Sequence, residues 1–169
     1  SVDGSRLAVC GDSAGGYLAT EVALRAIEAD GPDVSLQALI YPVIEPDFQS
    51  TTYQEFASGF GLTRDSMQWF WEHFLGGQQP YPDATPIRSP GLAKLPPAIV
   101  LTAEYDVLRE EGQRYAAKLE QSGVEVMHRK CDGMLHGFFH FAGIFDVGVE
   151  VCQELSNQIA QRLKADRRR

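Results

Sequence analysis

The sequence predicts an α/β fold, a mostly parallel sheet flanked by helices. Apolar runs of strand length alternate with helix-length segments along the 169 residues, and each parallel crossover needs a helix of this kind. The main strand-length runs are also continuously apolar, which indicates strands buried on both faces. The length is that of one domain.

Three continuous apolar runs and one alternating run predict four strands. The first two cover residues 6–10 and 36–44, and the third covers residues 98–103. In the fourth, residues 124–128, apolar side chains alternate with polar ones. This alternation is typical of a strand at the edge of a sheet.

Three segments with apolar residues at helical spacing predict the helices that cover the sheet. The first extends to about Ala29 and ends at Asp30-Gly31-Pro32, a helix-terminating sequence. The other two lie within residues 108–119 and 147–163. The apolar stripe of the first helix consists of Leu18, Val22 and Ala26.

The segment from Pro46 to Pro97 is longer than an ordinary crossover and is rich in aromatic residues. Within it, residues 63–74 predict a helix with Thr63 as its N-terminal cap. An insertion of this kind either packs on the sheet or forms a lid over a site. The pattern of residues leaves both alternatives open.

The charge and the cysteines exclude several classes of protein. A net charge of -8 and a pI near 4.9 argue against a nucleic-acid partner, which requires a basic face. The sequence has no apolar stretch of about 18 residues, so it predicts no membrane span. We expect buried free thiols without metal-ligand spacing, which favour the cytoplasm, at Cys10, Cys131 and Cys152.

The residues Gly11-Asp12-Ser13-Ala14-Gly15 match the G-x-S-x-G pattern of a nucleophile elbow. A predicted strand ends just before them and a predicted helix follows, which is the strand–turn–helix setting that an elbow requires. The turn would lift the Ser13 hydroxyl above the sheet, and the backbone N–H of Ala14 would then stabilise an oxyanion. A plain turn or a phosphate-binding loop is the alternative interpretation of these glycines.

A serine hydroxyl needs a base to become a good nucleophile. In the chain order of α/β hydrolases the acid comes next and the histidine last. Asp106 follows the third predicted strand and His136 follows the fourth, and catalytic loops lie past the carboxyl ends of such strands. Glu104 is the alternative acid, but it lies nearer to its strand and is expected to support the site.

The remaining histidines offer one further alternative. His136 and His140 are four residues apart, as in a helical metal pair, but a glycine follows the first and no Glu or Cys partner is nearby. We therefore expect no metal ion and no other cofactor. His73, His128 and His140 are interpreted as packing or surface residues.

Three motifs together resemble the hormone-sensitive-lipase-like family of carboxylesterases, which includes bacterial family IV. They are the elbow with Gly16, residues 103–112 and residues 132–139, and residues 39–43 and 69–71 are similar as well. The resemblance covers nearly the whole chain. It implies an α/β-hydrolase fold and an ester substrate. It also implies a nucleophile, an acid, a base and an oxyanion donor, which are Ser13, Asp106, His136 and Ala14.

The same resemblance implies a core of residues 1–45 and 81–169 with a cap at residues 46–80 above the acyl pocket. Trp69, Phe70 and Phe138 are the candidate pocket residues, and the aromatic insertion argues for short-to-medium acyl esters. Tyr17 departs from the family, which commonly has Asn after the glycines. This departure affects packing behind the elbow and touches no catalytic group.

A larger departure is that no His-Gly-Gly motif precedes Ser13, although the family builds its oxyanion hole with one. The chain resembles the C-terminal half of a hydrolase, so we expect weak or no activity from it alone. We expect a homo-oligomer or a complementing N-terminal half to cover the open edge of the strand at residues 6–10. The alternative functions are a non-catalytic ligand-binding module and an amidase or peptidase with the same triad.

Overall fold

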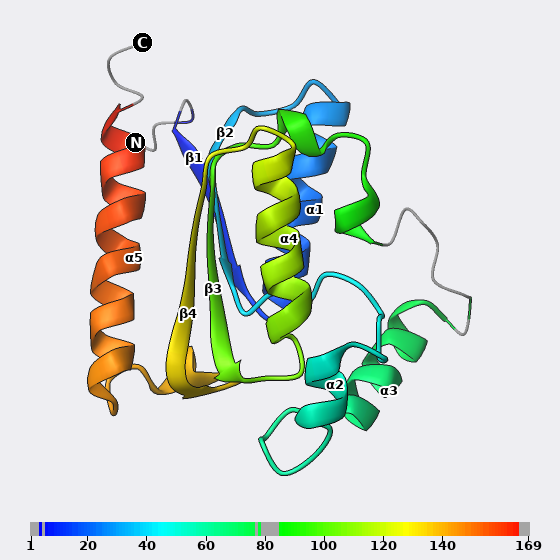
Figure 1. The fold of residues 1–169 in the computed structure, drawn as a ribbon. Helices are drawn as coiled ribbons and strands as arrows, with labels where there is room; N and C mark the ends of the chain where they lie inside the picture. The colour runs from blue at the N-terminus through cyan, green and yellow to red at the C-terminus, as the bar shows by residue number, and fades with distance from the viewer. Residues whose placement is uncertain (1–3, 5, 77, 79–84, 166–169) are drawn as a thin grey trace.

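The computed structural model describes residues 4, 6–76, 78 and 85–165 of the chain. Its sheet confirms the predicted fold class, because four parallel strands lie side by side in the order β1-β2-β3-β4 (Figure 1). All four carboxyl ends therefore meet along one edge of the sheet. The strands are β1 (Leu7–Asp12), β2 (Val34–Ile40), β3 (Ala98–Tyr105) and β4 (Val126–Leu135).

Helices cover both faces of this sheet. Helices α1 (Ala14–Glu28) and α4 (Arg109–Gln121) lie on one face, and α5 (Asp146–Ala165) lies on the other (Figure 1). Apolar side chains fill both interfaces, and the central strands β2 and β3 contribute to each of them. This burial on both sides explains why the sequences of β2 and β3 are largely apolar. None of the helices in the described part of the chain has the length and apolar character that crossing a bilayer requires.

Helix α1 forms where the sequence predicts it, but a different side of it faces the sheet. Ala19, Ala23 and Leu24 lie in the core, whereas Leu18 is 57% exposed and Val22 is 52% exposed. The stripe predicted to be buried is therefore largely exposed on this chain. The spacing of apolar residues identifies one side of a helix, but it does not determine which part of the protein that side packs against.

Strand β1 lies at one edge of the described sheet and pairs with β2 alone. Its side chains are covered less completely than those of β2, and Cys10 is exposed, so the expectation of a buried thiol is wrong there. Cys131 in β4 is buried as expected, and Cys152 in α5 is half-buried. All three are free thiols.

Strand β4 forms the other edge, as its alternating sequence predicts, but it extends to Leu135. Its register with β3 shifts between Ala103 and Tyr105, and Tyr105 then pairs with Leu135. At this irregularity the Glu104 carboxylate accepts a hydrogen bond of 2.6 Å from the backbone N–H of Gly133. The strand is therefore longer than the predicted run at residues 124–128, and the loop that carries His136 begins only after Leu135.

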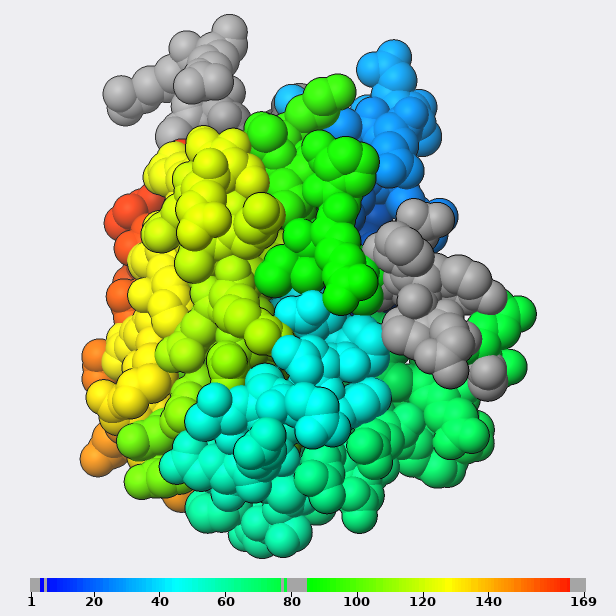
Figure 2. Space-filling view, turned by 45° about the vertical axis from the view of Figure 1, so that its right-hand side comes forward, coloured from blue at the N-terminus to red at the C-terminus, as the bar shows by residue number. Residues whose placement is uncertain are grey.

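The long insertion after β2 folds beside the carboxyl ends of the strands, as α2 (Thr51–Glu55) and α3 (Arg64–Phe74) (Figure 1). Helix α3 has the predicted cap, since the Thr63 hydroxyl accepts a hydrogen bond of 3.1 Å from the backbone N–H of Ser66. Figure 2 shows this segment, in cyan and green, packed closely against α4. Residues 77 and 79–80 of the predicted cap lie outside the described residues.

One apolar cluster joins the insertion to the rest of the fold. Trp71 of α3 and Tyr53 of α2 are buried together with Val107 and Leu108, which connect β3 to α4. Short 3-10 helices complete the chain: η2 (Pro86–Arg88) and η3 (Leu92–Lys94) precede β3, and η4 (Phe138–Phe141) follows β4. The insertion thus packs on the layer that α1 and α4 form.

A buried carboxyl group lies beneath the insertion. Glu111 of α4 is almost completely buried, and one of its oxygens accepts a hydrogen bond of 2.7 Å from the backbone N–H of Ile44. Burial raises the pKa of the nearby Tyr53 hydroxyl, and the negative charge of the Glu111 carboxylate raises it further. Burial raises the pKa of Glu111 itself well above its usual range, because the charged form loses its hydration.

We expect Glu111→Gln to stabilise the protein, and to do so more strongly at higher pH. The folded state holds the Glu111 proton more tightly than the unfolded state. The free energy of unfolding therefore falls as the pH rises from about 4.3 through the folded pKa. Glutamine keeps an acceptor for Ile44 without this loss, so we expect a gain of about 1 kcal/mol or more at pH 8 and little gain at pH 4.

Thermal unfolding of the wild type, Glu111→Gln and Glu120→Gln across this pH range measures the effect. Glu120 lies exposed on the same helix, so its substitution should show no comparable pH trend. If the stability gain of Glu111→Gln over the wild type does not grow as the pH rises, a neutral, buried Glu111 is contradicted.

Candidate active site

The turn between β1 and α1 holds Ser13 in an unusual backbone conformation. Ser13 has φ 54° and ψ -120°, and a positive φ is uncommon for a residue with a side chain. Hydrogen bonds hold this conformation on both sides of the residue. The Ser13 N–H donates to the carbonyl of Ile40 at 2.9 Å, and the Ser13 carbonyl accepts from the N–H of Val43 at 3.1 Å. The turn therefore fits the nucleophile elbow that the motif predicts.

Two glycines of the motif are required because backbone passes where a Cβ would stand. A Cβ on Gly11 would lie 2.1 Å from the carbonyl oxygen of Gly15, and one on Gly16 would lie 2.6 Å from the Cβ of Pro42. A Cβ on Gly15, in contrast, would have only the Asp12 carboxylate within reach, at 4.0 Å. The close approaches of β1 to α1 and of α1 to the end of β2 thus depend on Gly11 and Gly16.

The three residues predicted as a triad lie in one continuous hydrogen-bonded relay. His136 Nε2 lies 3.0 Å from Ser13 Oγ, and His136 Nδ1 lies 2.7 Å from Asp106 Oδ2. The second oxygen of Asp106 accepts a hydrogen bond of 2.9 Å from the backbone N–H of Leu108. With the proton on Nδ1, the imidazole donates to Asp106 and accepts from the serine hydroxyl, the arrangement that general-base catalysis requires.

Each member of the relay reaches this position from the carboxyl end of a different strand. Ser13 follows β1, Asp106 follows β3 and His136 follows β4. Gly137 then turns the chain with φ 81°, a left-handed conformation that glycine adopts without strain. Asp106 is buried, so its carboxylate is shielded from water and held by fixed partners.

Glu104, the alternative acid, points elsewhere. Its carboxylate accepts from the Gly133 N–H and lies 3.8 Å from the Lys130 ammonium group. It thereby braces the end of β4, just before His136. This contact agrees with the supporting role expected for it.

The other histidines make separate contacts. His128 Nε2 lies 3.1 Å from the Thr102 hydroxyl, and His73 Nδ1 lies 2.8 Å from the carbonyl of Trp69. His140 Nε2 lies 3.0 Å from the carboxylate of Asp12. His136 and His140 therefore face different partners and do not converge on a common ligand position.

Ala14 is the first residue of α1. The first N–H groups of a helix have no acceptor within it, and the helix dipole adds positive potential there. The backbone N–H of Ala14 is therefore one of the donors available beside the Ser13 hydroxyl, as the motif predicts.

An apolar hollow of about 400 Å³ opens beside Ser13. Helix α3 forms one wall with Phe70 among its side chains, whereas Trp69 and Phe138 do not line the hollow. Trp69 is 54% exposed and packs edge-on against Phe70, and Phe138 is buried against Tyr41. Of the three candidate pocket residues, the structure brings only Phe70 to the hollow. Its full lining is Ser13, Ala14, Tyr17, Leu18, Val43, Leu62, Met67, Phe70, Trp71 and Phe74.

Tyr17 is a wall residue that connects the elbow helix to the insertion. Its ring lies edge-on to Trp71 at 5.8 Å and to Phe74 at 5.4 Å between ring centroids. The departure from the family's usual Asn therefore adds an aromatic contact between α1 and α3. The sequence motif marks this position as different without indicating its new partners.

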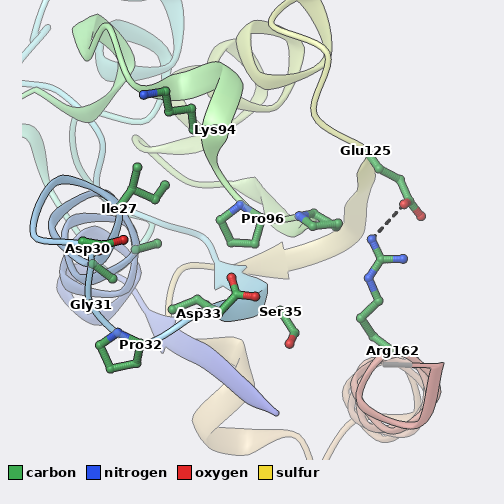
Figure 3. A pocket seen from close by; sticks show the side chains of 14 residues that line it. Ile27, Asp30, Gly31, Pro32, Asp33, Ser35, Lys94, Pro96, Glu125 and Arg162 are labelled. Carbon is green, nitrogen blue, oxygen red and sulfur yellow. Dashed lines mark hydrogen bonds and ion pairs between the residues drawn. The ribbon is translucent and has the colours of Figure 1, made fainter. Parts of the chain in front are cut away.

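A second hollow of about 670 Å³ lies at the amino ends of the strands (Figure 3). Its lining includes the charged residues Asp30, Asp33 and Lys94. An ion pair of 2.9 Å between Glu125 and Arg162 borders it. The relay lies at the carboxyl ends of the strands, so this polar hollow is separate from it.

The family model for the alpha/beta hydrolase fold matches residues 1–140. The chain belongs to this family. The resemblance of its motifs to the hormone-sensitive-lipase-like carboxylesterases is thereby confirmed. The predicted α/β-hydrolase architecture is confirmed in the same way.

Relatives of this hydrolase-family chain include named esterases. It is 33% identical over 148 residues to the ethyl acetate hydrolase of Pseudomonas putida, which covers 86% of this chain and 46% of that protein. It is 36% identical over 154 residues to the carboxylesterase NlhH of Mycobacterium tuberculosis, covering 88% of this chain and 48% of that protein. The hydrolase chain thus spans about half the length of these relatives.

A solved esterase structure shares the fold. A fungal esterase from Rhizomucor miehei superimposes with a TM-score of 0.88 at 37% identity. The match covers 97% of the hydrolase chain and 52% of the fungal chain. The elements described above therefore correspond to about half of that esterase chain.

We expect Gly16→Ala to disrupt this hydrolase chain and Gly15→Ala to be tolerated. The added methyl group at position 16 collides with Pro42 just after β2, whereas at position 15 it makes only an ordinary contact with the Asp12 carboxylate at 4.0 Å. Gly16→Ala should cost about 2 kcal/mol or more through overpacking. Gly15→Ala should change stability by less than about 1 kcal/mol, since alanine favours helices.

Chemical denaturation of the two variants beside the wild type checks this contrast. Equal losses from both substitutions would show that the approach of α1 to Pro42 does not control the elbow.

Proposed function

We propose that this chain carries the catalytic relay of a carboxylic ester hydrolase that works through an acyl-serine intermediate. The observation that carries the proposal is the unbroken path from the Ser13 hydroxyl through His136 to the buried Asp106 carboxylate. A continuous relay on a strained elbow serves acyl transfer, whereas a ligand-binding module needs neither feature. The esterases among the relatives support the same conclusion.

The reaction proceeds in two acyl transfers. His136 Nε2 takes the Ser13 proton as the oxygen attacks the ester carbonyl, while Asp106 holds the Nδ1–H and stabilises the imidazolium. The tetrahedral oxyanion is stabilised by the Ala14 N–H, and the alcohol leaves with the proton from His136. Water, deprotonated by His136, then attacks the acyl-serine and releases the carboxylic acid. Neither step calls for a metal ion or an organic cofactor.

The lining of the hollow supports an apolar acyl group of short-to-medium length. Its walls are aliphatic and aromatic side chains around Ser13, and α3 closes one side. Residues 46–80 then act as the cap of a core formed by residues 1–45 and 81–169. The same relay serves amide cleavage too, so the ester preference is tested against matched anilides.

We further propose that another polypeptide segment covers the free edge of β1. Leu18 and Val22 lie exposed on α1, which packs on β1. Phe141 at the end of η4 and Ile144 just after it are exposed as well. A complementing N-terminal segment suits this edge, because the chain spans about half the length of its relatives. A second copy of the chain is the other candidate. One oxyanion donor alone gives weak activity, since each missing donor costs about 10²–10³ in rate.

The free thiols favour a reducing compartment. Cys10 is exposed and unpaired, and such thiols persist where glutathione and thioredoxin keep them reduced. Together with the acidic composition, this supports the cytoplasm as the location of the protein.

A fluorophosphonate probe that reacts with activated serines should label the chain at Ser13, and Ser13→Ala should abolish labelling. Asp106→Asn keeps the shape but favours the wrong imidazole tautomer, so labelling should slow roughly 10³–10⁴-fold. Ser122→Ala, on an exposed serine bonded to the Lys118 carbonyl, is the control and should label normally. Intact-mass measurement and peptide mapping locate the adduct. A separate assay with p-nitrophenyl butyrate and the corresponding anilide compares the rates of ester and amide hydrolysis.

Labelling that survives Ser13→Ala would refute Ser13 as the nucleophile. Full turnover by the isolated chain, with rates typical of complete esterases, would instead refute the proposal that a further oxyanion donor comes from outside it.

The isolated chain should self-associate through the β1 edge in a concentration-dependent way. Exposed strand edges flanked by apolar side chains pair with other chains. The double substitution Leu18→Lys and Val22→Lys places charge beside this edge and should shift the population toward monomer. Sedimentation velocity at several concentrations measures the shift, with Trp69→Lys on α3 as the control. If the chain is monomeric at all concentrations, the prediction that the exposed edge of β1 pairs with another chain is contradicted.

A further inference from the structure

A second hydrogen-bonded cluster lies next to the relay and shares none of its side chains. Asp12, which precedes Ser13, accepts a hydrogen bond of 3.0 Å from His140 Nε2. The same carboxylate oxygen accepts one of 3.4 Å from the Tyr41 hydroxyl. Asp12 and His140 are 128 positions apart in the chain, so no sequence pattern connects them.

Tyr41 links this cluster to the catalytic histidine. Its ring is buried, and its centroid lies 4.7 Å from that of His136 and 5.5 Å from that of Phe138. Its hydroxyl interacts with the backbone N–H of Phe139 as well as with Asp12. Tyr41 itself has φ 36°, a strained conformation that surrounding contacts must maintain.

These contacts form a bridge between two loops. His140, which lies in η4, and Tyr41, which follows β2, both donate hydrogen bonds to the Asp12 carboxylate at the start of the elbow. One loop carries Ser13 and the other carries His136, and the two are far apart in sequence. A single 3-10 turn such as η4 has little stability of its own, so its position depends on contacts of this kind.

The bridge matters because proton transfer in the relay requires a precise distance between His136 Nε2 and Ser13 Oγ. Displacing a reacting group by about 1 Å can cost about 10²-fold in rate. His136 is held at Nδ1 by Asp106, which orients the ring, but the distance from Nε2 to Ser13 Oγ also depends on where the two loops sit. The bridge acts on that distance, because it ties residue 12 directly to residue 140.

We propose that Asp12, Tyr41 and His140 form a clamp that sets the distance between His136 and Ser13, with His140 as a positioning residue for acyl transfer. The clamp rests on the proposed function, because it serves the relay assigned there. His140 touches neither the substrate hollow nor the relay, and it acts through Asp12. Its side chain is 66% exposed, so the core does not depend on it.

A matched pair of substitutions at His140 isolates the hydrogen bond. His140→Gln keeps an N–H donor at a similar reach, whereas His140→Met keeps the approximate size and removes the donor. His73→Met is the control, because His73 is an exposed histidine on α3 whose contact is to the Trp69 carbonyl. Two measurements are made on each protein: the rate of fluorophosphonate labelling at Ser13, and the downfield proton resonance of His136 Nδ1–H.

We expect His140→Met to label about tenfold more slowly than the wild type, a smaller loss than the roughly 10²-fold that displacing a reacting group by about 1 Å can cause. His140→Gln should label within about threefold of the wild type, and His73→Met should match it. The Nδ1–H resonance should shift or broaden in His140→Met and keep its wild-type position in His140→Gln. Melting temperatures should agree closely for all of these variants, because His140 is mostly exposed.

The two readouts separate the clamp from the function on which it rests. If the wild type labels and both His140 variants label alike, with unchanged resonances, the clamp is refuted and the esterase proposal stands. If no protein labels, the relay does not activate Ser13 in this chain by itself, and the His136 resonance alone then decides whether His140 positions the imidazole. A resonance that changes in His140→Met and is restored in His140→Gln supports the clamp in either case.

Discussion

The left-handed backbone at Ser13 is the constraint around which the site is organised. A residue with a side chain adopts a positive φ only when its surroundings hold it there. Here the N–H of Ser13 donates to the end of β2 and its carbonyl accepts from Val43. Gly11 and Gly16 allow the backbones of β1, α1 and β2 to approach closely enough for these bonds to form. Strain at one residue is thus offset by packing and hydrogen bonds spread over three elements.

The two buried carboxyl groups near that turn, those of Asp106 and Glu111, have different functions. Asp106 accepts hydrogen bonds from the Leu108 N–H and from His136. Glu111 lies beneath the insertion, where burial raises its pKa and favours the neutral form. The first arrangement serves the relay. The second fixes the start of the insertion through Ile44, close to the segment that also bonds to Ser13.

The insertion and the histidine loop approach the elbow from separate directions. Helix α3 reaches it through Tyr17, Trp71 and Phe74 and forms an apolar wall. The histidine loop reaches it through polar contacts to Asp12. This division suits the proposed reaction, in which an apolar acyl group is bound while one imidazole is kept at a defined distance from one hydroxyl.

The sequence by itself predicted the fold class and the cap of α3, which the structure confirms. It also singled out the elbow and the order Ser13, Asp106, His136 for the proposed relay, because each of these predictions depends on a local pattern. Only the tertiary structure decided that Leu18 and Val22 face outward, that Phe70 and not Trp69 lines the hollow, and that β4 extends to Leu135. It alone joined His140 to Asp12. A periodic pattern specifies a side of a helix or strand, but the neighbour that this side meets depends on how distant segments pack.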